Sequence, residues 1–221
     1  MATIVRGTVP ADEFALSHTL GSAPDVEFEV ERIVDSGDDA LMPLLWVRGD
    51  RENGVADLLD ADPSVREVEL LAAFDDEWLY RMEWVDRIDL VLRMLTTSEA
   101  TVLDAHGRRD RWTLRVMYPD REDLSDTHEF CRSHGLSFDV RSIRELDGEP
   151  AGRYGLTTEQ FEALTTAAER GLFEVPRQTT MADLATELSV SHQALSERIR
   201  RATGALVEET LVVGVAGDES R

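Results

Sequence analysis

The stretch Thr180–Arg201, TMADLATELSVSHQALSERIRR, decides the interpretation of this 221-residue chain. Thr180 stands three residues before Asp183, which is the spacing of a helix N-cap with a capping box. Small and apolar side chains recur where two helices joined by a tight turn bury them: Leu184, Ala185, Val190, Leu195 and Ile199. The stretch therefore predicts a helix-turn-helix, with its turn at 189–191 and its second helix at 192–203.

The second helix of such a motif presents its first residues to the DNA major groove. Gln193 can pair with adenine and an arginine with guanine, while Thr180 and Ser191 at helix N-termini can contact phosphates. The predicted DNA-binding residues are Thr180, Ser191, His192, Gln193, Ser196, Glu197, Arg200 and Arg201. Double-stranded DNA is the predicted partner. The alternative is a helical hairpin that packs on another protein and contacts no DNA.

The charge of the chain is strongly acidic, with a formal net charge of -22, and all 23 basic residues are arginine. Residues 1–150 carry net -18 and residues 151–221 only net -4. A lysine-free acidic surface is typical of a protein from an extreme halophile, where molar salt screens self-repulsion. An ordinary acidic protein is the alternative. Either way, binding to DNA must be local, because the surface as a whole repels phosphate.

Several function classes find no support in the sequence. A single cysteine, Cys131, favours a reducing cytoplasm, and neither a secretory signal nor a membrane span is visible. Without lysine, P-loop and Schiff-base chemistry are excluded, and no acid–base pair indicates an enzyme. We therefore expect no cofactor and no catalytic activity. A non-enzymatic adaptor or a small-molecule-binding protein remains the second hypothesis.

The residues before the helix-turn-helix alternate between strand-like and helix-like patterns. Strands are predicted at 2–9, 26–34, 41–48, 65–73, 78–85, 100–106, 111–118 and 136–146, and helices at 10–20, 52–59, 87–95 and 121–134. This order is βαββαβ written twice, which predicts an α+β fold with a duplicated ferredoxin-like domain at 1–148. A Gly- and Pro-containing linker at 147–153 would lead to an all-α domain at 154–213.

Two other sets of residues are weaker candidates for a site. His128, Cys131 and His134 recur on one predicted helix and suggest a metal or redox site, although a buried structural cysteine beside surface histidines is the simpler interpretation. The four tryptophans are expected in the core, or around a ligand pocket: Trp46, Trp78, Trp84 and Trp112. Before the helix-turn-helix, a helix starting at Thr157 is expected to bury Phe161, Leu164, Ala168 and Leu172.

The segment 155–211 resembles the C-terminal domain of haloarchaeal bacterioopsin-activator (Bat) type regulators. The shared patterns are LTxxQxxAL from Leu156, AxxxGxFEVPR from Ala167 and LAxxLxVSxxALSERIRRA from Leu184. This resemblance implies DNA binding through 191–201 and a role in transcription regulation, with the basal transcription machinery as a possible partner. We expect the first domain to sense a small-molecule effector or to form a homodimer, because two half-sites about 34 Å apart add specificity.

Overall fold

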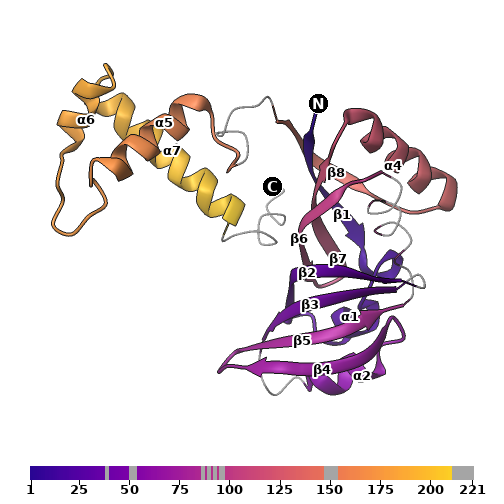
Figure 1. The fold of residues 1–221 in the computed structure, drawn as a ribbon. Helices are drawn as coiled ribbons and strands as arrows, with labels where there is room; N and C mark the ends of the chain where they lie inside the picture. The colour runs from indigo at the N-terminus through magenta and orange to yellow at the C-terminus, as the bar shows by residue number, and fades with distance from the viewer. Residues whose placement is uncertain are drawn as a thin grey trace. The chain divides into compact units, whose positions relative to one another are not determined.

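Figure 1 shows the fold of a computed structural model, which describes residues 1–37, 40–49, 54–85, 88, 91, 94, 98–146 and 154–210. The chain forms two compact units, Met1–Ile143 and Arg144–Arg221, which are described in turn. The predicted linker at 147–153 and most of the predicted helix at 87–95 lie outside the described residues. Among the helices of the described ranges, none is long and apolar enough to cross a membrane.

The first unit is built on one eight-stranded sheet, with neighbouring strands in the order β4-β5-β3-β2-β6-β7-β1-β8. Its strands are β1 Thr3–Pro10, β2 Glu27–Gly37, β3 Ala40–Arg48, β4 Val65–Ala73, β5 Glu77–Trp84, β6 Thr101–Arg108, β7 Arg111–Tyr118 and β8 Asp139–Glu145. Its helices are the 3-10 turn η1 Ala11–Glu13 and the α-helices α1 Ser17–Ser22, α2 Val55–Ala61 and α4 Arg121–His134. The eight strands and helices α2 and α4 occur in the predicted order, and the fold is mixed α and β.

The strands pair antiparallel, and β1 joins distant partners. Thr3–Pro10 runs antiparallel to Arg111–Tyr118, so β1 lies beside β7 and β8 and not beside β3. The β2–β3 and β6–β7 hairpins meet through Glu27–Glu29 and His106–Arg108 at the middle of the sheet. The two ends of the unit's sequence therefore close the sheet together at one edge.

One face of the sheet carries the core, because alternate residues of each strand point to the same side. Its centre is aromatic: Phe14 stands edge-on to Trp84 and Trp112, with ring centroids 5.2 Å away in each case. Trp84 and Trp112 are fully buried, as expected of core residues, whereas Trp46 and Trp78 are only half-buried. The Trp112 indole donates a hydrogen bond to the Ala15 carbonyl at 2.7 Å.

The single helix predicted at 10–20 is wrong, because the chain breaks at Leu16, whose φ is 62°. Phe14, Ala15 and Leu16 are all buried, which is more than the single apolar stripe that a helix on a sheet surface typically buries. The Ala15 carbonyl accepts from Trp112, and the Leu16 amide donates to Ser64 Oγ at 2.9 Å. Contacts from distant residues therefore replace the helical hydrogen bonds at this point.

Asp62 ties α1 to the turn between α2 and β4 from a buried position, with 2% of the residue exposed. One carboxylate oxygen accepts from the Thr19 amide at 2.9 Å and hydroxyl at 2.8 Å. The other accepts from the Ser64 amide at 3.0 Å and hydroxyl at 2.6 Å. All four donors are thus satisfied by one side chain, which is the condition under which a buried carboxylate is tolerated.

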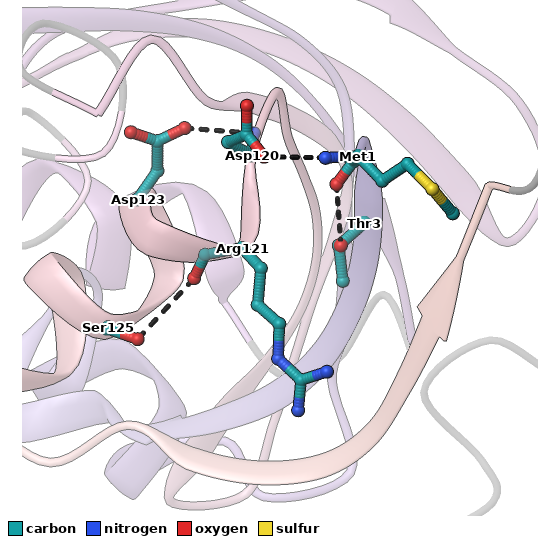
Figure 2. A network of polar contacts seen from close by, with 6 residues as sticks. All are labelled: Met1, Thr3, Asp120, Arg121, Asp123 and Ser125. Atoms are coloured by element: carbon teal, nitrogen blue, oxygen red, sulfur yellow. Dashed lines mark hydrogen bonds and ion pairs between the residues drawn. The ribbon is translucent and has the colours of Figure 1, made fainter.

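Helix α4 begins at a capping box, and Figure 2 shows its hydrogen bond between Asp120 and Asp123. The Asp120 amide donates to Asp123 Oδ2 at 2.9 Å, and the terminal ammonium of Met1 reaches Asp120 Oδ1 at 2.5 Å. The helix ends at Gly135, whose φ of 68° is the left-handed conformation typical of a C-cap glycine. Both ends agree with the predicted helix at 121–134.

The opposite face of the sheet carries paired charges. Arg115 Nε lies 2.5 Å from Asp104 Oδ2, and His106 Nε2 lies 3.9 Å from Asp104 Oδ1. Burial raises the pKa of Asp104, against the opposing effect of Arg115. Burial likewise lowers the pKa of His106, although Asp104 favours its protonated form. The arginines on this face offset part of the strong negative charge of the unit.

Candidate nucleic-acid interface

The second unit contributes three described α-helices, α5 Thr158–Glu169, α6 Met181–Glu187 and α7 His192–Thr210. Two capping boxes set the starts of α5 and α6. Thr157 Oγ1 accepts from the Gln160 amide at 3.3 Å, and Thr180 Oγ1 accepts from the Asp183 amide at 3.2 Å. The predicted capping box at Thr180 is present, with aspartate in the place where glutamate is commoner.

The three helices pack around a small core. Leu184, Ala185 and Leu195 are buried, and Val190 and Ile199 are half-buried against them. These are the five residues that the sequence predicts to be buried. On α5 the prediction is partly wrong: Ala168 is exposed, and the buried face consists of Ala163 and Ala167 together with Leu172 after the helix.

The turn between α6 and α7 is tight because Ser189 adopts the left-handed conformation, with φ of 54°. The Val190 amide then donates to the Ala185 carbonyl at 2.9 Å, which closes the end of α6. Ser191 Oγ accepts from the Ala194 amide at 3.1 Å and thereby caps α7. This geometry turns the start of α7 outward, as a helix-turn-helix requires.

The predicted DNA-binding residues are mostly exposed to solvent. Ser196 is half-buried and the others are exposed: Thr180, Ser191, His192, Gln193, Glu197, Arg200 and Arg201. The hydroxyl of Thr180 donates to Asp183 Oδ2 at 2.6 Å, so its proton is already engaged. The hydroxyl of Ser191 accepts the cap hydrogen bond and keeps its own proton for a donor role.

Glu197 links two of these residues along α7. Its Oε1 accepts from Gln193 Nε2 at 3.3 Å, and its Oε2 accepts from Arg201 Nη2 at 3.4 Å. The three residues are four positions apart and so lie on one stripe of the helix. Sequence reasoning placed them on the same face but did not anticipate that one carboxylate holds the other two.

Helix α7 is longer than predicted, because it continues past residue 203 to Thr210. Gly204 suggests an end, yet Ala205 and Leu206 pack with Ala202 against Leu156 at the start of the unit. The C-terminal turns of α7 therefore pack against the residues that precede α5, while the first turns carry the exposed polar residues.

Arg198, a residue outside the predicted set, lies on the flank of α7 that faces the start of α5. Thr157, Glu159, Gln160, Arg198 and Arg201 line a shallow pocket of about 250 Å³. A hydrogen bond from Thr157 lowers the pKa of Glu159, and Arg198 adds a smaller effect in the same direction. Two arginines and one carboxylate thus line this pocket.

The loop between α5 and α6 carries Arg177, a second residue that the sequence analysis did not single out. Gly171, with φ of 73°, lies so close to Gln178 that an added Cβ would meet its side chain at 2.9 Å. The Gln178 amide donates to the Gly171 carbonyl at 3.1 Å and closes the loop. Arg177 is exposed on it, three residues before the cap of α6. Its position just ahead of the helix N-cap at Thr180 was the feature of the sequence that could have identified this arginine.

The metal candidates on α4 do not come together. Cys131 is buried in the core of the first unit, whereas His128 and His134 are exposed. His134 stacks on Phe130, with ring centroids 4.0 Å apart. Within the described ranges no group of histidine, cysteine and carboxylate residues converges on a possible metal position. Burial raises the pKa of Cys131 to about 11, which disfavours a reactive thiolate.

Both units match known protein families. Residues 8–157 match the family described as BAT, a GAF and HTH_10 associated domain. The chain belongs to the BAT family. Residues 156–208 of this BAT-family chain match HTH_10, described as an HTH DNA binding domain, and they contain α5, α6 and nearly all of α7. The resemblance that sequence patterns indicated for the C-terminal quarter is thereby confirmed and extends to the sheet domain.

Curated relatives of this BAT-family chain carry a regulatory name. This chain is 30% identical over 112 residues to the dimethyl sulfoxide reductase transcriptional activator of Halobacterium salinarum, and the match covers 48% of this chain and 50% of the relative. It is 30% identical over 144 residues to the protein of the same name from Haloferax volcanii, covering 64% and 61%. The chain thus spans between half and three-fifths of the length of these relatives.

Proposed function

We propose that this BAT-family chain is a sequence-specific transcriptional regulator that binds double-stranded DNA through residues 191–203 of α7. The observation that carries the proposal is the helix-turn-helix itself, whose core is filled while the first turns of α7 present polar side chains to solvent. The HTH_10 match and the names of the curated relatives support the same function.

Within this proposal, the exposed residues of α7 divide into base-reading and phosphate-binding groups. Gln193 and Arg200 are both exposed and seven positions apart on α7, and their side chains suit adenine and guanine edges. Ser191 at the start of α7 and Arg177 ahead of α6 are suited to phosphates on either side of the groove. His192 and Ser196 flank the reading stripe. Thr180 contributes through the N-terminus of α6, because its hydroxyl proton is held by Asp183.

The test starts from a selection for DNA sequence with the full chain. Random duplexes of about 30 base pairs, long enough for two half-sites, are enriched in about 2 M KCl, where phosphate contacts alone are weak. Gln193→Ala and Arg200→Ala are each expected to weaken binding to the enriched duplex by roughly 5- to 150-fold, as loss of a two-hydrogen-bond base contact should. Arg132 is an exposed arginine of α4, far from α7 in the sequence. The control variant Arg132→Ala removes the same charge as Arg200→Ala and should leave binding unchanged.

Enrichment of no sequence, or equal effects of all three variants, would refute DNA reading by α7. It would favour the adaptor hypothesis, in which the same helices bind a protein. The proposal also places the chain in a cytoplasm of molar salt and without catalytic activity. The acidic, lysine-free composition and the organisms of the relatives support this placement.

The proposal includes a homodimer, in which the sheet domain joins two copies or binds a small effector. One recognition helix offers few base contacts, and two copies reading half-sites one DNA turn apart would multiply them. The sheet face that carries Asp104, His106 and Arg115 is proposed for such a role, because the Asp104 carboxylate there is paired with Arg115 and lies 3.9 Å from His106. Contact with the transcription machinery belongs to the same proposal.

The sheet domain is further proposed to be a pair of ferredoxin-like units that exchange their first strands. In such a unit the first strand lies between the third and the fourth. Here β5 lies between β3 and β4, and β1 lies between β7 and β8. The antiparallel pairing of β1 with β7 and of β5 with β3 and β4 supports this interpretation. Each half of the sheet would then depend on a strand from the other half of the sequence.

A further inference from the structure

Glu197 is an acid at the centre of the surface proposed to bind DNA. Its two carboxylate oxygens accept from different neighbours, Gln193 Nε2 at 3.3 Å and Arg201 Nη2 at 3.4 Å. About half of the Glu197 side chain is exposed, 49%, so the carboxylate also faces solvent. A carboxylate in this place repels the phosphate backbone, and the helix does not need it, because exposed pairs of this kind contribute little to stability.

The arginines of α7 are not equally accessible to DNA. Arg200 is exposed and, among the described residues, forms no hydrogen bond or ion pair. Arg201 is held by Glu197, and Arg198 lines the pocket beside Glu159. The basic charge of the reading surface is therefore partly neutralised from within the same domain. DNA that binds Arg201 therefore competes with its contact to Glu197.

We propose that Glu197 is a positioning residue that sets specificity by holding Gln193 and Arg201 until a matching DNA sequence replaces it. This inference rests on the proposed DNA-binding function. Random DNA offers Arg201 only a phosphate, in exchange for the Glu197 contact and against the repulsion of the carboxylate. A matching site also offers base edges to Gln193, and a cytosine amino group can donate to the carboxylate itself. Glu197 thus penalises non-specific binding more than specific binding, which widens the difference between them.

The test is Glu197→Gln in the full chain, measured against the enriched duplex and a scrambled duplex of equal composition over a series of KCl concentrations. Glutamine keeps the size of the side chain but removes its charge, and with one acceptor oxygen it cannot accept from both Gln193 and Arg201. We expect affinity for the scrambled duplex to rise about 4-fold at ~0.2 M KCl, with a salt slope steeper by about one phosphate contact. Affinity for the enriched duplex should change less, so the ratio of the two affinities falls.

Two controls separate positioning from a general charge effect. Glu208→Gln removes one exposed acid from the same helix and should change both affinities by the same small factor. In the double variant Glu197→Gln/Arg201→Ala, the salt slope for the scrambled duplex should return to the wild-type value. Circular dichroism of each variant checks that α7 is retained.

The outcomes distinguish this inference from the function on which it rests. A wild-type chain that prefers the enriched duplex, with the same preference in Glu197→Gln, overturns the role of Glu197 alone. An unchanged salt slope in Glu197→Gln does so too, because Arg201 would then not have been released. A wild-type chain that binds both duplexes equally overturns the DNA-reading function and this inference with it.

Discussion

Replacing Asp62 with alanine is expected to destabilise the sheet domain strongly, because four buried donors depend on this carboxylate. Thr19 and Ser64 each give it an amide and a hydroxyl at 2.6 to 3.0 Å, and all three residues are at least nine-tenths buried. Alanine leaves both amides and the Ser64 hydroxyl without this acceptor, whereas the Thr19 hydroxyl can still donate to the Leu58 carbonyl at 3.2 Å. Breaking such a charged buried network costs about 3–5 kcal/mol. That is a large part of the total stability of roughly 5–15 kcal/mol expected for a domain.

Urea unfolding followed by tryptophan fluorescence is the suitable assay, because all four tryptophans lie in the first unit. Asp62→Asn keeps the shape but turns an NH2 group toward two donors, so its loss of stability should approach that of Asp62→Ala. Asp60→Ala, an exposed neighbour on α2, is the control and should change stability by less than about 0.5 kcal/mol. A loss below about 1 kcal/mol for Asp62→Ala would refute the reasoning that this residue fixes α1 against α2 and β4.

Three further predictions concern single residues in both units. Cys131, whose pKa burial raises to about 11, should resist thiol reagents at neutral pH until urea unfolds the sheet domain, and earlier labelling would contradict its buried position. Thr180→Ala should destabilise the helical domain by about 1 kcal/mol in helix melting followed by circular dichroism, with the exposed Thr203→Ala as control. Burial lowers the pKa of folded His106 below 6.5, so the unfolded state binds a proton first on acidification. Stability should therefore fall as pH drops through about 6.5, and His106→Gln should lose this dependence.

Elements with local signals at both ends could be predicted closely from the sequence. Helix α4 begins after Pro119 and Asp120 and ends at Gly135, and the structure places it at Arg121–His134. Strand β7 alternates buried and half-buried or exposed residues, and its predicted bounds agree with the structure. The helix-turn-helix core could be predicted equally well, because its five buried or half-buried residues recur at helical spacing and need no distant partner.

Features that depend on distant contacts could not be predicted in this way. The break at Leu16 arises from Trp112 and Ser64, which lie far away in the sequence. Similarly, α7 continues through Gly204 because later residues pack on Leu156. The place of β1 beside β7 depends on sheet pairing across the whole unit. The link from Glu197 to Gln193 and Arg201 is local, but side-chain orientation rather than spacing decides it.

The most direct test of the central claim, that α7 reads bases, is a measurement of atom-level coupling between Gln193 and adenine. Each adenine of the enriched duplex is replaced in turn by 7-deazaadenine, which lacks the N7 acceptor that a glutamine side chain uses. The account predicts that at one adenine per half-site the wild-type chain loses about fivefold or more in affinity, whereas Gln193→Ala loses nothing. Equal losses for both proteins at every adenine, or no loss for the wild-type chain, would contradict the claim.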